Sequence, residues 1–496
     1  MRVARAQRWV PALLLGALGA ASCGGSEEPV RPPDVILVVV DTLRADRLSA
    51  YGYERPTSPW MANRAASGAL FEDVTAQSSW TLPSMVSLMS GRYLTSYRDA
   101  LDPEVPALAE GFQAAGYATV GVVGNVLVNE GAGFDRGFEH FDARRSRSST
   151  EVNTFARKLD ELSGDLWEPL TAALQPEADG ERRPLFLYLH PFDPHAPYFE
   201  HEELGEVLPP LESPDFAPEG WHAEQLIAAG IDAPPQDPGW ADEQEEMREQ
   251  RGFYDQEVLW SDQMLAALFN RLANEGVLEN AVVALVSDHG EGLWEHVRPY
   301  QESKRPNRPR EFFYQEHGFD LHEEQLRTPF LLWGAGVPAG VRVEEAVENV
   351  DLFPTLYELA GVVPPPGLHG QSLVPLLNGE ANWAPKERVY SYALVGGMVR
   401  EPLSGLKLIA PTYYEHELRD TPVQLYDVRA DEHERRDLLA ERPQDAARLF
   451  AHLERWRRQH PTRGSVTTAA ERNPDMGDLG YGEEHSARGD EDFVAP

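Results

Sequence analysis

Three short segments carry side chains that are suited to chemistry on an anionic ester. Asp41 ends one apolar run, and Asp288 and His289 end another. Thr81 lies just before a short helix that Pro83 is expected to open. Carboxylates and imidazoles bind divalent cations, and coordination to a cation favours the alkoxide of a threonine. The residue types therefore predict a metal site beside a nucleophilic hydroxyl group.

Each of these residues also has a purely structural interpretation. A carboxylate at the end of a strand often caps a helix, and Thr81 is predicted to be the N-cap of its own helix. The same helix terminus attracts anions, because its unpaired N–H groups and its dipole are positive. The presence of all three segments together, rather than any one of them, favours a catalytic site.

The hydrophobic pattern predicts the elements that must position these side chains. Apolar runs typical of strands buried on both faces occupy residues 35–40, 118–123, 185–189, 281–286 and 330–333. Helical patterns occupy residues 59–67 (with Ser58 as cap), 83–90, 105–115 and 252–273. This alternation predicts an α/β fold with a large mixed, mostly parallel sheet sandwiched by helices. Ligands bind at the carboxyl ends of the strands in such sheets, where Asp41 and Asp288 lie.

Composition divides the 496 residues into five segments. They are a signal peptide of lipoprotein type (1–23), a tether (24–33), the main domain (34–365), a smaller C-terminal α+β subdomain (366–458) and a disordered acidic tail (459–496). Residues 196–250 lack a clear period and are expected to form a long surface excursion near the site. The subdomain is expected to contain strands near 389–395 and 406–410 and a helix over 443–457.

The amino terminus has the pattern of an export signal. Three arginines precede a short apolar stretch, and Ala-Ala-Ser leads into Cys23, which is the only cysteine. Cys23 lies where a bacterial lipoprotein signal places its lipidated residue, although an ordinary cleaved signal with an incidental cysteine is the alternative. The apolar stretch is too short to span a bilayer. We expect an exported protein of the bacterial cell envelope, periplasmic or at the cell surface, that is anchored in a membrane by a lipid on Cys23.

The charge of the chain limits its partners. With 44 basic and 81 acidic residues the formal charge is -37, which argues against nucleic acid as a partner, because no basic face is available to neutralise phosphates. Residues 298–310 form a basic island that follows Asp288 and His289. This island either forms a lip over the site or is a solvated loop that balances nearby acidic residues.

Several motifs resemble the sulfatase family of the alkaline phosphatase superfamily. Residues 79–93 resemble the helix that carries the nucleophile in that family, with its terminal Gly-Arg-Tyr. Further similarity is found at residues 317–329, 351–356, 370–373 and 425–438, so that the resemblance runs from about residue 34 to residue 457. It implies the superfamily fold and an activity on sulfate or phosphate esters.

The nucleophile motif departs from the usual sulfatase pattern. Most sulfatases carry Cys or Ser in a Cys/Ser-x-Pro-x-Arg motif, which is oxidised to formylglycine, whereas the aligned residues here are Thr81, Pro83 and Met85. Threonine cannot yield that aldehyde, so we expect no formylglycine. The pattern resembles superfamily members that use threonine directly, such as nucleotide pyrophosphatases and the phosphoethanolamine or glycerophosphate transferases of bacterial envelopes.

The resemblance also implies a metal site and two catalytic histidines. The acidic pair of the family appears here as Asp41-Thr42, and its Asp-Asn pair appears as Asp288-His289. We expect one divalent metal ion held by Asp41, Thr81, Asp288 and His289. A nitrogen donor favours zinc or manganese, with calcium as a possible alternative.

Further histidines are candidates for a role in the site. His195 matches a family histidine that contacts the transferred group or protonates the leaving oxygen, and His317 matches another contact. His190 and His296 lie outside such motifs and are weaker candidates, although His190 would be able to join the site or hold a second metal with Asp193.

These residues predict a metal-dependent hydrolase of sulfate or phosphate esters, in which Thr81 attacks and His195 assists the departing oxygen. The substrate would be a sulfated or phosphorylated small molecule or glycan. Breakdown of a phosphothreonine by metal-bound water is easier than breakdown of a sulfothreonine, which favours phosphoryl chemistry. The alternatives are an envelope phospho-group transferase similar to phosphoethanolamine transferases and a non-catalytic lipoprotein that binds anions.

Overall fold

The computed structural model describes most of the chain in one compact unit that starts at Pro33. The described residues are 31–94, 100–144, 156–178, 180–204, 207–208, 211, 238–297, 313–318, 320–380, 383–393, 396–411, 413–414, 417–418 and 423–460. The predicted signal peptide, most of the tether, the tail beyond residue 460 and the basic island lie outside this set. Among the described helices, none combines the length and the apolar character that a membrane span needs.

An eight-stranded sheet forms the main core, in the order β11-β2-β10-β7-β1-β6-β4-β5. Its strands are β1 (Asp34–Val40), β2 (Ala69–Phe71), β4 (Ala118–Val123), β5 (His140–Asp142), β6 (Leu185–His190), β7 (Ala281–Ser287), β10 (Phe330–Gly334) and β11 (Val341–Val343). The five strands from β7 to β5 in this order are parallel, whereas β10 runs antiparallel to both of its neighbours. The predicted mixed, mostly parallel sheet is confirmed.

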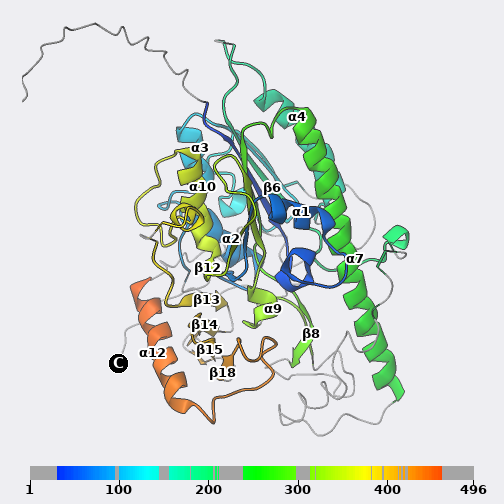
Figure 1. Cartoon of the computed structure of the whole chain (residues 1–496), viewed down its shortest axis with the longest axis vertical. Coiled ribbons are helices and arrows are strands. Elements are labelled where there is room, and N and C mark those ends of the chain that lie inside the picture. The colour runs from blue at the N-terminus through cyan, green and yellow to red at the C-terminus, as the bar shows by residue number, and fades with distance from the viewer. Residues whose placement is uncertain are drawn as a thin grey trace, which may run out of the picture. The chain divides into compact units, whose positions relative to one another are not determined.

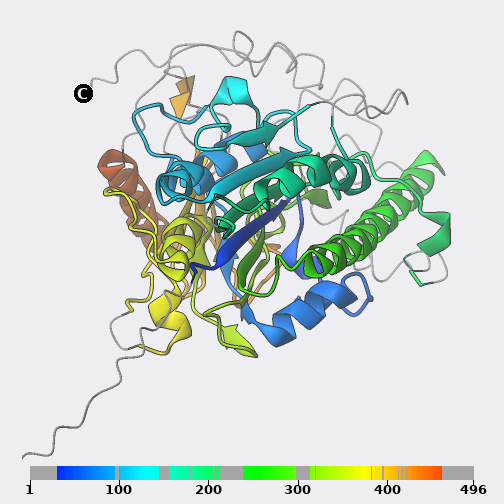
Figure 2. The ribbon, with the colours of Figure 1, turned by 90° about the horizontal axis from the view of Figure 1, so that it is seen from above.

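Helices cover both faces of this sheet (Figure 1; Figure 2). On strand β1, Val35, Leu37 and Val39 belong to one apolar core and the alternate residues belong to the other. One core contains side chains of α2 (Thr81–Ser90), α3 (Leu108–Ala114) and α10 (Leu352–Ala360). The other contains side chains of α1 (Pro59–Ser67), α4 (Leu159–Ala173) and α7 (Pro238–Asn274). Burial on both faces explains why this strand is apolar without interruption.

Several helix starts and one cap differ from the prediction: α2, α3 and α7 start at Thr81, Leu108 and Pro238 instead of residues 83, 105 and 252. The hydroxyl of Ser58 does not cap α1, because it accepts a hydrogen bond from the N–H of Ser49 (2.8 Å). Instead, the carboxylate of Asp262 in α7 accepts the N–H groups of Trp60 and Met61, at 2.9 and 2.8 Å. A residue distant in sequence thus provides the cap that the local pattern had assigned to Ser58.

Helix α2 begins two residues earlier than predicted. Thr81 is its first residue and Trp80 occupies the N-cap position, so the prediction that Thr81 is the N-cap was wrong. Helix α7 starts at Pro238, so the predicted excursion over residues 196–250 was wrong from that residue onward. From residue 245 to 250 only Met247 is buried, which explains why this part of the helix shows no clear period.

A second, smaller sheet lies in the C-terminal part of the chain, as predicted. It is antiparallel, in the order β13-β14-β15-β18, with bounds β13 (Val389–Ala393), β14 (Gly396–Arg400), β15 (Leu406–Pro411) and β18 (Gln424–Asp427). Helix α12 (Pro443–Gln459) packs on it through Leu449, Leu453 and Trp456. The remaining described strands are the pairs β3–β12 (Val74–Thr75, Val347–Glu348), β8–β9 (Gly292–Val297, Phe313–Glu316) and β16–β17 (Tyr413–Tyr414, Glu417–Leu418). Short helices are α9 (Glu323–Leu326) and α11 (Val374–Leu377).

Candidate active site

Polar side chains gather at the carboxyl ends of four adjacent parallel strands. Asp41 follows β1, Asp288 follows β7, His190 ends β6, and Asn125 lies two residues beyond β4. The register pairs the last residues of β1 and β7, which brings Asp41 and Asp288 to the same edge of the sheet. This is the edge where open α/β sheets bind ligands.

The carboxylates of Asp41 and Asp288 are fully buried. Asp41 Oδ2 accepts a hydrogen bond from Asn125 Nδ2 (2.5 Å) and lies 3.5 Å from His190 Nε2. Asp288 Oδ1 accepts the N–H of His289 at 2.9 Å. The other oxygens, Asp41 Oδ1 and Asp288 Oδ2, have no hydrogen-bond partner among the described residues. Buried carboxylate oxygens without donors are costly, and a cation is the group that would satisfy them.

The pKa values of the two carboxylates are shifted by their burial and by the charges of their neighbours. Burial and the charge of Asp41 raise the pKa of Asp288 to about 7. Burial acts in the same direction on Asp41, but the hydrogen bond with His190 and the nearby imidazoles outweigh it and hold the pKa of Asp41 below its usual range. The two carboxylates therefore oppose each other's ionisation, and a cation bound between them would remove that opposition.

Thr81 presents its hydroxyl at the amino end of α2, next to His289. Thr81 Oγ1 is buried, 3.1 Å from His289 Nε2 and 3.5 Å from Asn125 Nδ2. His289 Nδ1 lies 2.7 Å from the carbonyl oxygen of Gly290, which can only accept, so Nδ1 carries the proton. Burial lowers the pKa of His289 to about 4, so the ring is neutral. His289 Nε2 thus offers a lone pair, either to the Thr81 hydroxyl or to a cation.

Two more histidines, His317 and His195, extend the site through ring contacts that start at His289. The His317 ring lies 4.4 Å from the His289 ring, and the His195 ring lies 4.8 Å from the His317 ring. His317 Nδ1 is 3.1 Å from Glu291 Oε1, and His317 Nε2 is buried without a hydrogen-bond partner among the described residues. Burial raises the pKa of Glu291 to about 7 and lowers that of His317 to about 4. It also lowers the pKa of His195.

The structure thus brings all of the predicted site residues together. These are Asp41, Thr81, His195, Asp288, His289 and His317. Their roles stay predictions.

Sequence reasoning gave no role to Asn125 or Glu291. Asn125 follows a predicted strand, and Glu291 lies two residues beyond His289. Their places after buried strands were the signals that would have identified them. His190 joins the site, whereas the carboxylate of Asp193 accepts the N–H of Leu159 (2.6 Å) and pairs with Lys158 (3.4 Å).

Two family models match this chain. The model described as Sulfatase matches residues 33–362, and the model described as N-sulphoglucosamine sulphohydrolase, C-terminal, matches residues 312–459. The first match alone covers more than half of the chain. The chain belongs to the sulfatase family. The predicted family resemblance is confirmed at that level.

Curated relatives of this sulfatase-family protein include arylsulfatase K from several vertebrates. The Danio rerio protein is 29% identical over 203 residues, which is 40% of this chain and 36% of the relative. The Mus musculus protein is 32% identical over 138 residues, or 28% of this chain and 22% of the relative. The Xenopus laevis protein is 24% identical over 390 residues, or 72% of this chain and 68% of the relative. The first two matches thus span about a third or less of those relatives.

Solved structures show the same fold at low sequence identity. The phosphonate monoester hydrolase of Agrobacterium radiobacter has a TM-score of 0.64 at 19% identity and covers 88% of this chain and 98% of its own. A 2-O GAG sulfatase has a TM-score of 0.63 at 21% identity, covering 87% and 93%. A protein solved with D-glucosamine-2-N,6-O-disulfate has a TM-score of 0.65 at 18% identity, covering 87% and 98%. These similarities confirm the predicted fold class.

Proposed function

We propose that this sulfatase-family protein hydrolyses sulfate or phosphate esters with Thr81 as its nucleophile. The observation that carries this proposal is the position of Thr81 Oγ1, which lies at the amino end of α2 and 3.1 Å from His289 Nε2. The unpaired N–H groups of a helix terminus bind anions, so an anionic ester would lie beside this hydroxyl. No formylglycine is required in this scheme.

The donor set fits a divalent cation. Ligand atoms of Asp41, Asp288 and His289 lie within 4.8 Å of one another, and the two carboxylates each have an oxygen without a hydrogen bond. Sulfatase-family enzymes are typically metal-dependent. We propose that these three residues hold the cation together with Thr81 Oγ1, and the nitrogen donor favours zinc or manganese over calcium. The bound cation would act as a Lewis acid that lowers the pKa of the Thr81 hydroxyl.

The transfer itself requires a nucleophile and a proton donor. Thr81 Oγ1, which would have released its proton to water on binding the cation, forms the new bond to phosphorus or sulfur while the bond to the leaving oxygen breaks. His195 donates a proton to that oxygen. Burial lowers the pKa of His195 in the free protein, whereas contact with an anionic ester raises the pKa of an imidazole and would allow it to carry that proton. Water then cleaves the Thr81 ester and regenerates the hydroxyl group.

Glu291 orients His317 for contact with the ester. Its carboxylate accepts from His317 Nδ1 at 3.1 Å, which leaves His317 Nε2 free of hydrogen bonds within the described part of the chain. An imidazole fixed in this way presents one defined nitrogen to a substrate oxygen. Glu291 is therefore a positioning residue, and His317 is a proposed substrate contact.

The proposed substrate is a sulfated or phosphorylated sugar or small molecule. Sulfated sugars are suggested by the relatives, since one protein of this fold was solved with a glucosamine disulfate. Phosphate or phosphonate monoesters are the second candidate, which Thr81 itself favours, because a phosphothreonine is cleaved more readily than a sulfothreonine.

The test is turnover of p-nitrophenyl sulfate, phosphate monoester, phosphate diester and phosphonate, each with zinc, manganese or calcium. We expect metal-dependent cleavage that is lost in Thr81→Ala and partly retained in Thr81→Ser, which keeps the hydroxyl. The preferred substrate would decide between sulfuryl and phosphoryl transfer. Absence of turnover with every substrate would instead favour the transferase or the anion-binding protein, and metal content would separate those two.

We also propose that the protein is exported and anchored by a lipid on Cys23. The amino-terminal pattern of basic, apolar and small residues supports this proposal. The test is fractionation of cells that express the natural protein or Cys23→Ala. We expect the natural protein in the membrane fraction and the variant outside it, whereas the same fraction for both proteins would contradict a lipid anchor.

A further inference from the structure

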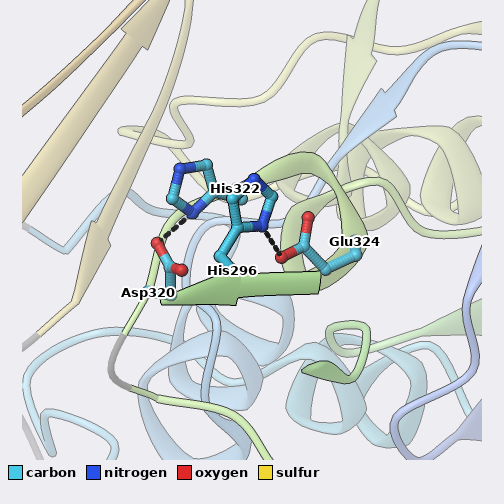
Figure 3. A group of neighbouring side chains, drawn as sticks. All are labelled: His296, Asp320, His322 and Glu324. Atoms are coloured by element: carbon cyan, nitrogen blue, oxygen red, sulfur yellow. Dashed lines mark hydrogen bonds and ion pairs between the residues drawn. The ribbon is translucent and has the colours of Figure 1, made fainter. Parts of the chain in front are cut away.

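A second group of histidines and carboxylates shares no residue with the active site (Figure 3). His296 belongs to β8, Glu324 belongs to α9, and Asp320 and His322 lie just before that helix. His296, Asp320 and His322 are at least 95% buried. One donor atom from each of the four residues lies within 4.8 Å of the others. We refer to these four residues as the second cluster.

The two imidazole rings of the second cluster are stacked in parallel. Their centroids are 3.7 Å apart and their planes differ by 4°. His296 Nδ1 lies 2.7 Å from Glu324 Oε1, and His322 Nδ1 lies 2.5 Å from Asp320 Oδ1 (Figure 3). Asp320 Oδ2 is buried without a hydrogen-bond partner among the described residues. Each ring therefore directs the same nitrogen at a carboxylate.

The outer nitrogens of both rings are held by groups near or in the small C-terminal sheet. His296 Nε2 lies 3.1 Å from the carbonyl oxygen of His433, and His322 Nε2 lies 3.3 Å from the hydroxyl of Tyr426 in β18. A carbonyl oxygen can only accept, so His296 Nε2 carries a proton. In a neutral His296 the lone pair is then on Nδ1 and faces the Glu324 carboxylate. Two groups that both carry lone pairs repel each other, so a cation must lie between them.

Between His296 and Glu324 that cation is either a proton or a metal ion. The His322 ring differs, because the Tyr426 hydroxyl is able to donate to its Nε2, so that a neutral His322 would donate from Nδ1 to Asp320. Protons alone leave Asp320 Oδ2 buried without a hydrogen-bond partner among the described residues. One divalent ion bound by all four residues would satisfy this oxygen and would replace the proton between His296 and Glu324.

We propose that His296, Asp320, His322 and Glu324 form a second metal site, with Zn²⁺ as the ion that suits it best. Histidine nitrogens and carboxylate oxygens both bind zinc at about 2.0–2.2 Å, which places the donors of a tetrahedral site about 3.5 Å from one another. The atoms that lie 2.7 and 2.5 Å apart would have to separate by about 1 Å. Donors that lie up to 4.8 Å apart would have to approach by a slightly larger amount. Hydrogen bonds from the outer ring nitrogens to a carbonyl or hydroxyl are the usual support of such ligands.

The second site would be structural rather than catalytic. Its four protein ligands complete a tetrahedral set, whereas a catalytic zinc keeps one position for substrate or water. It would join β8 and α9 and, through His433 and Tyr426, fix their contact with the small sheet. The inference stands without the proposed function, because it uses none of the active-site residues.

The test measures zinc bound per chain in a background that lacks the active-site ion. We expect Asp288→Asn to retain one equivalent of zinc after dialysis and the double variant Asp288→Asn, His322→Gln to retain none. A matched control adds His201→Gln instead, which removes a histidine that lies 3.4 Å from the buried carboxylate of Glu257, outside the cluster. Equal zinc content in all three proteins would overturn the proposal.

Folding is checked with a milder variant, Asp320→Asn, which preserves the size of the side chain. Chelation is expected to lower the Tm of Asp288→Asn, and added zinc is expected to restore it. In the Asp288→Asn, Asp320→Asn protein with native near-UV circular dichroism, neither treatment should shift the Tm. A Tm of Asp288→Asn that does not respond to chelation and zinc would show that the second cluster is a hydrogen-bonded network without a metal ion.

Discussion

The active site and the second cluster combine the same side-chain types in different ways. Both place buried histidines against buried carboxylates. The active site draws its residues from the ends of four parallel strands and adds the hydroxyl of Thr81. The second cluster comes from a single segment, residues 296–324, and each of its Nδ1 atoms faces a carboxylate. Both sites contain a buried carboxylate oxygen without a hydrogen-bond partner among the described residues, so the hydroxyl of Thr81 is the feature that distinguishes the active site from the second cluster.

Removing the nucleophile should produce the largest effect on activity, because the Thr81 hydroxyl is the group that the active site has and the second cluster lacks. Thr81→Ala is expected to lower kcat by about 10³-fold or more, because the covalent route is lost. Thr81→Ser should retain much of the activity, since it keeps a hydroxyl at the same helix terminus. The check is kcat on the preferred p-nitrophenyl ester for proteins with equal metal content. An alanine variant within tenfold of the natural protein would contradict a role for Thr81 as nucleophile.

Removing the active-site cation should produce the next largest effect. Asp288→Asn weakens the donor set and is expected to lower kcat by about 10²-fold or more. Chelation of the natural protein should have a similar effect that zinc or manganese reverses. The measurement is activity against bound metal during titration. Full activity at zero bound metal would contradict a catalytic role for a cation in the active site.

Loss of the group that positions His317 should have a smaller effect. Glu291→Ala is expected to lower kcat/KM by about tenfold, because His317 Nδ1 loses the acceptor at 3.1 Å. Glu291→Gln still offers an oxygen there and should recover most of that loss. Steady-state kinetics of the two variants measure the effect. Equal losses in both would show that the charge of Glu291, rather than its hydrogen bond, is what matters.

Asp262 is a buried carboxylate outside both sites whose oxygens are already hydrogen-bonded. Its replacement should therefore change the stability of the protein and leave its metal content unchanged. Both of its oxygens accept N–H groups of α1, so Asp262→Ala is expected to lower the free energy of unfolding by about 1–2 kcal/mol without changing metal content. Chemical denaturation measures that loss. A change in bound zinc would contradict the separation of this carboxylate from both clusters.

The same carboxylate predicts a pH dependence. Burial raises the pKa of Asp262 from 3.8 to about 6, so the folded state binds its proton more tightly than the unfolded state. The stability that this proton contributes is complete below pH 3.8 and is lost as the pH rises towards 6. Asp262→Asn cannot titrate. The stability advantage of the natural protein over Asp262→Asn should therefore shrink by on the order of 2 kcal/mol across this range.

The sequence predicted the parts of the fold that local patterns determine. Burial on both faces made β1 and β4 mostly apolar, interrupted only by Asp34 and Thr119, so their bounds were predicted to within one residue. The start of α2 and the cap of α1 were not predicted correctly. The cap of α1 comes from Asp262, about 200 residues away, and no local pattern reveals such a partner.

The candidate site was predictable to the extent that it lies at strand ends. Asp41 and Asp288 each follow a buried strand, and the sheet order places them at one edge. Asn125 follows a strand as well, but a single amide after a strand is too common to stand out. The second cluster escaped prediction because its partners, including the carbonyl of His433, meet only in the folded chain. The predicted domain boundaries stay predictions.

The most direct test of the central claim is to trap the covalent intermediate on Thr81. A single-turnover reaction with the preferred ester is quenched with acid, digested and analysed by mass spectrometry. The account predicts that the peptide with Thr81 gains the mass of one phosphoryl or sulfuryl group, and that Thr81→Ala shows no adduct. Full turnover without any adduct on Thr81, or an adduct on another residue, would contradict it.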